Sequence, residues 1–308
     1  MRSVLVTGGA GFIGSSLVRA LLARDLRVTV LDSLVNGSEA FLPADERLVF
    51  ERGDITDAED LDRALAVEPD AVVHLAAHHF IPFCDANPAE TIRTNVYGTQ
   101  LLLERLAGRS SVRRLVFAST AAVYAPSPAA LAETDAVQPI DIYGISKRVC
   151  EEVIELFGRR NDVSCVSARF FNAIGPRETN PHLLPDIIEQ LVAGRDQLEL
   201  GNLLPTRDYI YVDDVASAVE RLLESDVVGA VNVGTGAAYS AREMVDELES
   251  ILGRALEVVS TPERQRLGDR PALIANNERL RGLGWQPAGD FRESLHRTLA
   301  ASGLVGAP

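Results

Sequence analysis

The chain has 308 residues, of which 46% are hydrophobic and 24% charged, and its formal net charge at pH 7 is -14. This length and composition suit either one large α/β unit or a nucleotide-binding domain with a smaller partner. The acidic balance argues against a nucleic-acid partner, because a phosphate backbone requires clustered Lys and Arg. No apolar run reaches the roughly 20 residues of a membrane span, and no signal core follows Met1, so we expect a cytoplasmic protein without a membrane partner.

Short β-branched runs alternate with longer amphipathic stretches in the first half of the chain. The expected strands lie near residues 4–6, 28–31, 47–51, 71–75, 115–117 and 164–168. The expected helices cover residues 12–23, residues 91–106 after the start signal Asn87-Pro88, and a stretch that begins near Asp141. Strands that are apolar on both faces lie between two helical layers, so this order predicts a doubly wound parallel sheet of the α/β class.

After Arg169 the regular alternation of strands and helices ends, and Gly and Pro residues separate shorter segments. Helices are expected near residues 184–193 and 241–252, in a smaller α/β lobe. Strand-like runs at 209–212 and 230–233 predict that the chain returns to the sheet before it completes this lobe.

A glycine-rich loop, TGGAGFIG, runs from Thr7 to Gly14, directly between the first strand and the first helix. In this context glycines let the backbone turn and approach a pyrophosphate, which the amides of the helix N-terminus bind. Asp32 ends the second strand about 20 residues further on, where a carboxylate accepts hydrogen bonds from the adenosine ribose and repels a 2′-phosphate. The two signals predict NAD rather than NADP. Asp54 and Ile55 are expected beside the adenine, with a helix cap as the alternative role for Asp54.

Tyr143 and Lys147, in the sequence YGISK, are four residues apart and therefore lie on one face of a helix. A tyrosine has an ordinary pKa of about 10, so it is mostly protonated at neutral pH. Positive charge from a lysine and an oxidised nicotinamide stabilises the phenolate. The phenolate then accepts a proton from a substrate hydroxyl as hydride leaves the same carbon. Ser119 and Thr120 end a strand at the edge where such sheets bind ligands, and Thr120 would hydrogen-bond the reacting oxygen. The alternative for Tyr143 and Lys147 is a surface tyrosine with an incidental lysine. The alternative for Ser119 and Thr120 is that they cap the end of the strand.

These motifs together resemble the extended short-chain dehydrogenase/reductase family, in its nucleotide-sugar epimerase and dehydratase branch. The resemblance covers nearly the whole chain; further matching motifs are Leu75-Ala76-Ala77, NVYGT from Asn95, RFFN from Arg169, Gly175-Pro176-Arg177, TRDYIYVDD from Thr206, and Leu283-Gly284-Trp285. It implies a Rossmann domain that binds NAD, formed by residues 1–170 and 208–236, and a substrate lobe formed by residues 171–207 and 237–308. The implied cofactor-binding residues are Gly8, Gly11, Phe12, Ile13, Gly14, Asp32, Asp54, Ile55, Leu75, Ala76, Ala77, Asn95, Tyr143 and Lys147.

Departures from the family pattern bear on the reaction type. Dehydratases of this branch carry an Asp-Glu pair directly after the catalytic threonine, whereas Ala121 and Ala122 stand here. The resemblance therefore implies a 4-epimerase that oxidises C4 of a UDP-hexose or UDP-hexuronic acid to a transient 4-keto sugar and returns hydride to the opposite face. The alternatives are an NDP-sugar dehydratase, 4-ketoreductase or net dehydrogenase, and a non-catalytic NAD-binding sensor on the same scaffold.

In this family the residues at Asn172, Arg207 and near Arg266 hold the substrate diphosphate, and Leu200 is expected near the nucleobase. A surface role for Arg266 and core packing for Leu200 are the alternatives. His78, His79 and His182 depart from the family pattern, and each is either a sugar or phosphate contact or a packed loop residue. Arg177 is either a partner for a hexuronate carboxylate or part of a turn surface.

No cluster has metal-ligand spacing, so no metal is expected, and Cys84, Cys150 and Cys165 are interpreted as reduced thiols. Family relatives pair two helices per subunit in a homodimer. Residues 91–106 and 141–157 fit that role, although burial within one subunit explains their apolar faces equally well.

Overall fold

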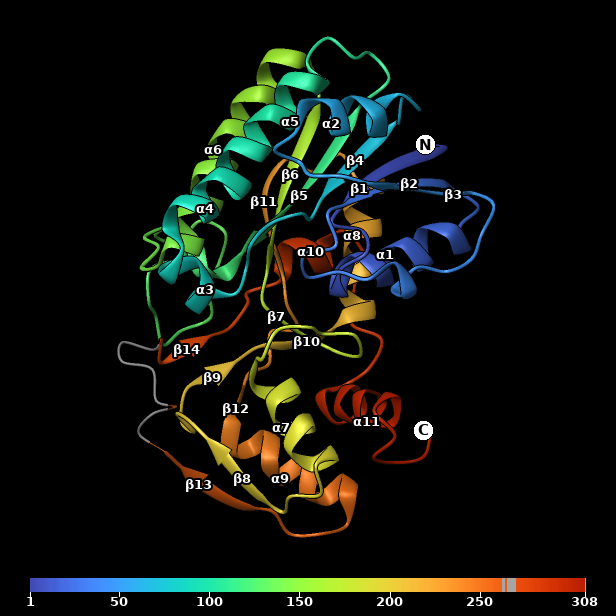
Figure 1. Ribbon diagram of the computed structural model, residues 1–308. Helices are drawn as coiled ribbons and strands as arrows, with labels where there is room; N and C mark the ends of the chain where they lie inside the picture. The colour runs from blue at the N-terminus through green and yellow to red at the C-terminus, as the bar shows by residue number, and fades with distance from the viewer. Residues whose placement is uncertain (262–263, 265–269, 308) are drawn as a thin grey trace.

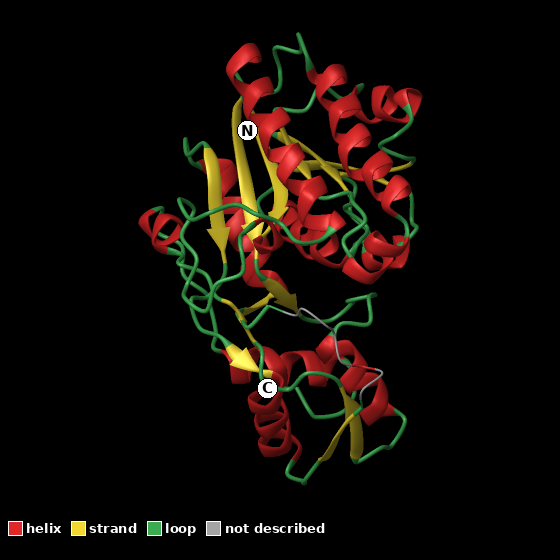
Figure 2. Cartoon of the chain, turned by 90° about the vertical axis from the view of Figure 1, so that its left-hand side faces the viewer, coloured by secondary structure: helices red, strands yellow, loops and turns green. Residues whose placement is uncertain are grey.

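The computed structural model describes residues 1–261, 264 and 270–307. A seven-stranded sheet lies between two layers of helices, and a smaller lobe lies beyond the carboxyl ends of its strands (Figure 1, Figure 2). The strand order is β11-β6-β5-β4-β1-β2-β3, and every neighbouring pair is parallel. The strands are β1 Ser3–Thr7, β2 Arg27–Asp32, β3 Leu48–Arg52, β4 Ala71–His74, β5 Arg114–Thr120, β6 Ser164–Phe170 and β11 Gly229–Val233. The prediction of a doubly wound parallel sheet is confirmed.

Successive side chains of a strand point to opposite faces, so the sheet has a hydrophobic core on each side. On one side Val4 and Val6 of β1 pack in a buried cluster with Leu17 of α1 and Val219 of α8. On the other side Leu5 of β1 belongs to a cluster with residues of α2, α5 and α6. These helices are α1 Phe12–Ala23, α2 Ala58–Leu65, α5 Gly98–Leu106, α6 Ile142–Asn161 and α8 Val212–Glu224.

The order of the strands creates the ligand crevice. The chain proceeds from β1 through β2 to β3 at one edge, then crosses to β4 on the other side of β1. At such a switch point the loops leaving the two strands turn in opposite directions and open a crevice at the carboxyl ends of the strands. The glycine loop after β1 and the loop after β4 therefore face each other across this crevice.

The predicted helix at 91–106 is a continuous helical stretch in three parts: α4 Pro88–Ile92, a π-helical segment Arg93–Tyr97 and α5. It starts directly after Asn87, as the start signal predicted. The short helix α3 Ile81–Ala86 precedes it. Among the residues that the structure describes, no helix combines the length and apolarity that a membrane crossing requires.

The smaller lobe has its own buried cluster, which includes Leu184, Leu200, Met244 and Leu295. Its elements are β7 Asn172–Ile174, α7 Leu183–Val192, β8 Gln197–Leu200, β9 Thr206–Arg207, β10 Tyr209–Tyr211, β12 Tyr239–Ser240, α9 Ala241–Leu252, β13 Glu257–Ser260, β14 Ala272–Leu273 and α11 Phe291–Ala301. The late helix α10 Glu278–Gly282 contributes Leu280 to the core of the large sheet instead.

One expectation about the sheet needs correction. The run at 230–233 returns to the main sheet as β11, which pairs with β6. The run at 209–212 does not: β10 pairs with β7 in a separate two-stranded sheet. The reason is that β11 already occupies the free edge of β6, so β10 finds its partner in β7, the strand that follows β6 in the chain.

Candidate active site

The glycine loop turns so tightly that two of its glycines, Gly8 and Gly14, have no room for a side chain. Gly8 has a φ of +73°, and a Cβ added there would lie 2.7 Å from the Ala76 nitrogen on the loop after β4. A Cβ on Gly14 would lie 2.1 Å from the Gly8 carbonyl oxygen. Gly11, the N-cap residue of α1, makes no side-chain cap to this helix, so the first amides are oriented toward a pyrophosphate site, as the motif predicts.

The carboxylate of Asp32 is held at the end of β2 by two backbone donors. Its Oδ2 accepts from the Ala10 amide at 2.9 Å, and its Oδ1 accepts from the Leu34 amide at 2.8 Å. Burial raises the pKa of Asp32, and these two hydrogen bonds oppose that shift. The carboxylate is thus oriented beside the glycine loop, which is the arrangement that an adenosine ribose requires.

One cavity of about 1230 Å³ joins the crevice to the smaller lobe. Typical single-ligand pockets measure about 300–1,000 Å³, so this cavity has room for a dinucleotide and a second ligand. The predicted site residues that line it are Gly8, Gly11, Phe12, Ile13, Gly14, Asp32, Asp54, Ile55, Leu75, Ala76, Ala77, His78, His79, Ser119, Thr120, Tyr143, Lys147, Asn172, His182, Leu200 and Arg207. The glycine contacts, the oriented Asp32 and this volume all fit NAD.

Tyr143, Lys147 and Thr120 meet at the carboxyl end of β5. Asp141 caps α6 by accepting from the Gly144 amide at 2.7 Å, which sets the helix start so that Tyr143 and Lys147 face the cavity. Lys147 Nζ donates to the Ala118 carbonyl at 2.8 Å and lies 5.9 Å from the centroid of the Tyr143 ring. The Thr120 hydroxyl hydrogen-bonds the phenol, and its oxygen also accepts from the Ala122 amide at 3.1 Å.

Burial opposes charge on both members of this pair. It raises the pKa of Tyr143 above its ordinary value, although the hydrogen bond with Thr120 lowers it in part. It lowers the pKa of Lys147, which is the only lysine in the sequence, to about 8. The phenolate therefore needs further positive charge, which an oxidised nicotinamide supplies when bound.

Ser119 lines the cavity, but its hydroxyl points elsewhere. It donates to Glu151 Oε1 at 2.6 Å, and Glu151 also accepts two hydrogen bonds from the Arg169 guanidinium, each of 2.8 Å. Both charged side chains are at most 5% exposed. The prediction of a catalytic hydroxyl at Ser119 is therefore corrected: its hydroxyl is directed to Glu151 of α6, whereas that of Thr120 is directed to the phenol.

Asn95 and Arg177 do not line the cavity in the described part of the chain. Asn95 donates to the His78 carbonyl and to Ser146 Oγ, each at 2.9 Å, and accepts from the His78 amide at 2.8 Å. It thus fixes the loop that lines the cavity. Arg177 donates to Ser15 at 3.1 Å and to Ser16 at 2.8 Å on α1, so its guanidinium is directed to that helix and not into the cavity.

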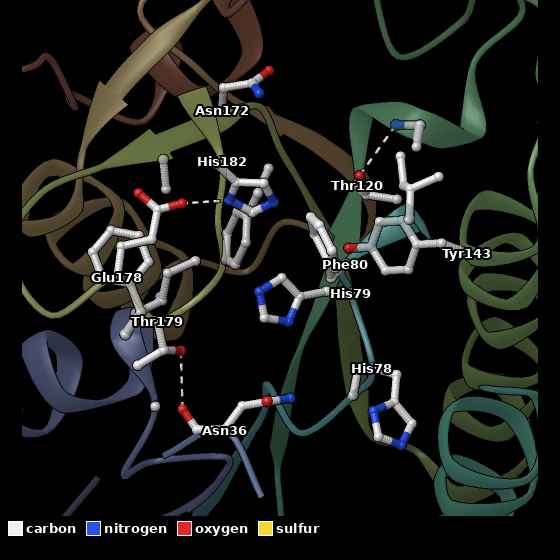
Figure 3. Close-up of a pocket in the computed structure, with 18 of the residues that line it drawn as sticks. Asn36, His78, His79, Phe80, Thr120, Tyr143, Asn172, Glu178, Thr179 and His182 are labelled. Carbon is white, nitrogen blue, oxygen red and sulfur yellow. Dashed lines mark hydrogen bonds and ion pairs between the residues drawn. The ribbon is translucent and has the colours of Figure 1, made fainter. Parts of the chain in front are cut away.

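The three predicted histidines have different surroundings (Figure 3). The His78 ring lies tilted against the Phe83 ring, with 4.7 Å between centroids, and faces Glu90, with 3.4 Å between its Nε2 and the carboxylate. Burial lowers the pKa of His79 to about 4, so its ring is neutral, and its Nε2 accepts from the side-chain amide of Asn180 at 2.8 Å. His182 hydrogen-bonds the carboxyl of Glu178.

The predicted phosphate-binding residues are only partly described. Asn172 and Arg207 line the cavity, and Arg207 Nη1 also donates to the carbonyls of Thr206 and Arg270. Arg266 lies outside the described residues. Within the described ranges, no group of three or more His, Cys, Asp or Glu side chains is arranged to hold a metal ion, and the three cysteines are free and buried.

Two further cavity residues were missed by sequence reasoning. Arg270 donates to the carbonyls of Ala122 and Tyr124, at 2.8 and 2.6 Å, and so braces the turn after Thr120. Glu178 is buried on the opposite wall. Neither has a sequence signal, because Arg270 is distant from Thr120 in the chain and Glu178 sits in an irregular loop.

The glycine turn, the acidic strand end and the Tyr143–Lys147 helix define a dinucleotide-binding protein of the extended short-chain dehydrogenase/reductase type. The model of the NAD dependent epimerase/dehydratase family matches residues 4–234, and the chain belongs to that family. The resemblance inferred from the sequence is confirmed.

Known relatives match over nearly their full length. A UDP-glucose 4-epimerase from Rhizobium meliloti is 34% identical over 312 residues, which cover 94% of this chain and 93% of the relative. The structure resembles Thermus thermophilus UDP-glucose 4-epimerase in complex with NAD, with a TM-score of 0.90 and 34% identity over 99% of this chain and 100% of that one. It also resembles Thermotoga maritima UDP-glucose 4-epimerase with UDP-glucose, with a TM-score of 0.90 and 31% identity over 97% of this chain and 98% of that one.

Proposed function

We propose that this chain is an NAD-dependent nucleotide-sugar 4-epimerase that acts on a UDP-linked sugar. The observation that carries the proposal is the meeting of Tyr143, Lys147 and Thr120 in the same cavity as the glycine loop. The names of the relatives support the reaction and the nucleotide. Ala121 and Ala122 stand where a dehydratase needs an additional acid and base, so elimination of water is not equipped.

The residues act on the proton and on the C4 oxygen. Gly8, Gly14 and Asp32 would hold NAD, which when bound would supply the acceptor for the C4 hydride and its donor to the opposite face of that carbon. Tyr143 takes the proton of the C4 hydroxyl in the first half of the cycle and gives it back in the second. Thr120 hydrogen-bonds the C4 oxygen, and the Lys147 ammonium stabilises the phenolate. The wide cavity allows a 4-keto sugar to turn over between the two steps.

The segment from Arg177 to Asn180 supports tight retention of the cofactor. Arg177 binds α1, Thr179 Oγ1 donates to the Asn36 carbonyl at 3.0 Å, and Asn180 pairs with His79. The segment therefore connects the loop of the smaller lobe to three elements around the crevice. We propose that NAD copurifies with the protein because this segment hinders its release.

The proposal assigns a different ligand to each of the two lobes. Residues 1–170 with 208–236 would bind NAD, and residues 171–207 with 237–308 would bind the nucleotide sugar, although Leu280 and Trp285 pack in the core of the large sheet. Asn172 and Arg207 would hold the diphosphate through charge-assisted hydrogen bonds, and Leu200 would lie near the nucleobase. Their common position on the cavity wall supports these roles.

A homodimer is the proposed assembly. Apolar side chains remain exposed on the helices predicted to pair: Ile92 at 39%, Tyr97 at 50%, Ile145 at 41%, Val149 at 37% and Leu156 at 39%. Burial of this face against a second copy would remove it from water. Light scattering of the protein and of a Val149→Glu variant tests this assembly.

The free cysteines, the NAD and the nucleotide sugar all fit the cytoplasm, which is the proposed compartment.

Incubation with UDP-glucose, followed by NMR of the products, tests the activity. We expect UDP-galactose, no net change of absorbance at 340 nm, and NAD released on denaturation of the purified protein. Tyr143→Phe is expected to lower kcat by about 10²–10⁴ while bound NAD stays at the wild-type level. Accumulation of NADH in proportion to substrate would instead indicate a net dehydrogenase, and unchanged turnover by Tyr143→Phe would remove the proposed base.

A further inference from the structure

Arg270 reaches from the smaller lobe to the catalytic groups and is almost completely buried. It lies two residues before β14, which pairs with β9 at the junction of the large sheet and the smaller lobe (Figure 1). The residue is 7% exposed and lines the cavity. Its carbonyl accepts from Arg207 Nη1 at 3.0 Å, and the Pro271 carbonyl accepts from the Thr206 amide at 3.0 Å, so the backbone is fixed to β9. A buried guanidinium is costly unless its donors are satisfied, so the partners of Arg270 indicate what it does.

The turn after β5 provides two of these partners. Arg270 Nη1 donates to the Tyr124 carbonyl at 2.6 Å, and Nη2 donates to the Ala122 carbonyl at 2.8 Å. The Ala122 amide donates in turn to Thr120 Oγ1 at 3.1 Å. One guanidinium therefore holds the turn whose amide orients the hydroxyl that faces the phenol.

The same guanidinium faces the start of the catalytic helix. Arg270 Nη2 lies 3.9 Å from Oδ2 of Asp141, the N-cap residue of α6, and that carboxylate is 9% exposed. Asp141 Oδ1 accepts from the Gly144 amide at 2.7 Å. The helix start packs directly on the turn, because a Cβ added to Gly144 would lie 2.6 Å from the Ala122 carbonyl oxygen. Arg270 thus contacts both elements that position Thr120 and Tyr143.

The phenol of Tyr143 has titratable neighbours on three elements. Burial raises its pKa, and the hydrogen bond with Thr120 of β5 lowers it in part. Cys84 of α3 and Asp141 raise this pKa further. Lys147, on the next turn of α6, lies 5.9 Å from the centroid of the ring and supplies positive charge. The negative charge of Asp141 therefore opposes the phenolate that the reaction requires.

Arg270 supplies the positive charge that Asp141 faces. Burial raises the pKa of Asp141, the Gly144 amide and Arg270 lower it, and Asp85 of α3 raises it. The Asp85 carboxylate itself accepts from the Ile142 amide at 3.0 Å, so it is held at the same helix start. Removal of the guanidinium would leave this negative charge uncompensated beside the phenol.

We propose that Arg270 is a positioning residue for the reaction, which holds the Thr120 turn against the start of the Tyr143 helix and offsets the charge of Asp141. It acts through these groups and takes no part in proton transfer itself. The inference rests on the proposed 4-epimerase function, in which Tyr143 is the base.

The test measures kcat and KM for UDP-glucose against pH in the wild type, in Arg270→Met and in Arg114→Met. Arg114 is a matched control: it is 6% exposed, donates to the Leu222 and Val227 carbonyls from the other end of β5, and is not among the described residues that line the cavity. We expect Arg270→Met to lower kcat by about tenfold or more and to change KM by less than about threefold. The acid limb of its kcat profile should move to higher pH by about half a unit or more, because the charge of Asp141 disfavours the phenolate. Arg114→Met should keep the wild-type kcat and acid limb, and a kcat in Arg270→Met within about threefold of wild type, or an unshifted limb, overturns the proposal.

A second substitution separates charge from geometry. Asparagine at position 141 keeps the capping oxygen and removes the carboxylate charge. Addition of Asp141→Asn to Arg270→Met should return the acid limb to the wild-type position or below it, while kcat stays low because the turn is still not held. Asp141→Asn alone should move the limb to lower pH by about half a unit, which tests the proposal even where Arg270→Met does not fold. A limb that stays shifted in the double variant, or that does not move in Asp141→Asn, contradicts the proposal.

Titration of the phenol provides a test that needs no turnover. In NAD-bound protein labelled with ¹³Cζ-tyrosine, comparison with Tyr143→Phe assigns the Tyr143 signal among the six tyrosines of the chain. We expect this signal to titrate at a pH higher by about half a unit or more in Arg270→Met than in the wild type or in Arg114→Met. Equal titration in all three proteins overturns the proposal. Absence of turnover with every UDP-sugar would count against the epimerase function, whereas this titration would still decide the role of Arg270.

Discussion

Replacement of Lys147 by methionine is expected to remove activity and to stabilise the NAD-free protein. Lys147 is 2% exposed, and burial lowers its pKa from 10.5 to about 8. At about 1.4 kcal/mol per pH unit, the charged lysine costs the folded state about 3 kcal/mol at pH 7. Methionine fills a similar volume without charge, but the hydrogen bond to the Ala118 carbonyl, worth about 1 kcal/mol, is lost. The net gain is about 2 kcal/mol.

The sign of the pH dependence follows from the two pKa values. Below pH 8 the lysine is protonated in both the folded and the unfolded chain, so the full cost is present. As the pH rises from about 8 to 10.5, the folded protein releases its proton first, and the unfolded chain holds more protons. Wild-type stability therefore rises through this range, and the advantage of Lys147→Met shrinks and then vanishes above it.

Thermal unfolding of NAD-free protein between pH 7 and pH 10.5 measures this effect. With an unfolding entropy of about 2.1 cal/mol/K per residue, a gain of about 2 kcal/mol corresponds to a Tm about 3 °C higher at pH 7. Because Lys147 is the only lysine in the sequence, protein labelled with ¹⁵N-lysine gives a single Nζ signal whose titration reports the pKa directly. A variant no more stable than the wild type at pH 7, or a difference that widens with pH, would refute the reasoning. In the same variant kcat is expected to fall by about 100-fold or more.

Three further changes test other parts of the site. Ser119→Ala should keep most of kcat because the Ser119 hydroxyl donates to Glu151. Thr120→Val should lower kcat by about tenfold or more. Steady-state kinetics that reverse this order would contradict the assignment of the two hydroxyls. Gly14→Ala places a Cβ 2.1 Å from a backbone carbonyl oxygen, so we expect loss of bound NAD and a stability lower by about 1–3 kcal/mol, measured by cofactor release and urea unfolding. Glu151→Gln leaves the buried Arg169 guanidinium uncompensated and should lower the free energy of unfolding by about 3–5 kcal/mol. Glu152→Gln, on the exposed side of the helix, should lower it by less than about 1 kcal/mol. Equal urea midpoints for the two variants would count against the buried ion pair.

Local sequence determined the parts of the site that depend on backbone geometry. The loop from Gly8 to Gly14 is recognisable because its conformation excludes side chains at these two glycines, and the alternation of strands and helices predicts on which edge of the sheet the loop lies. The spacing of Tyr143 and Lys147 is set by the helical repeat alone. These features could be predicted because each rests on residues close together in the chain.

Tertiary structure decided where individual side chains point and which charges are buried. Ser119 and Thr120 are chemically similar neighbours, and only the packing of α6 against β5 directs one hydroxyl to Glu151 and the other to Tyr143. The sequence left Arg177 as either a partner for a sugar carboxylate or part of a turn surface, yet it reaches Ser15 and Ser16 of α1, more than 160 positions earlier in the chain. Such contacts leave no local pattern, because they depend on how distant elements are brought together when both cores are buried.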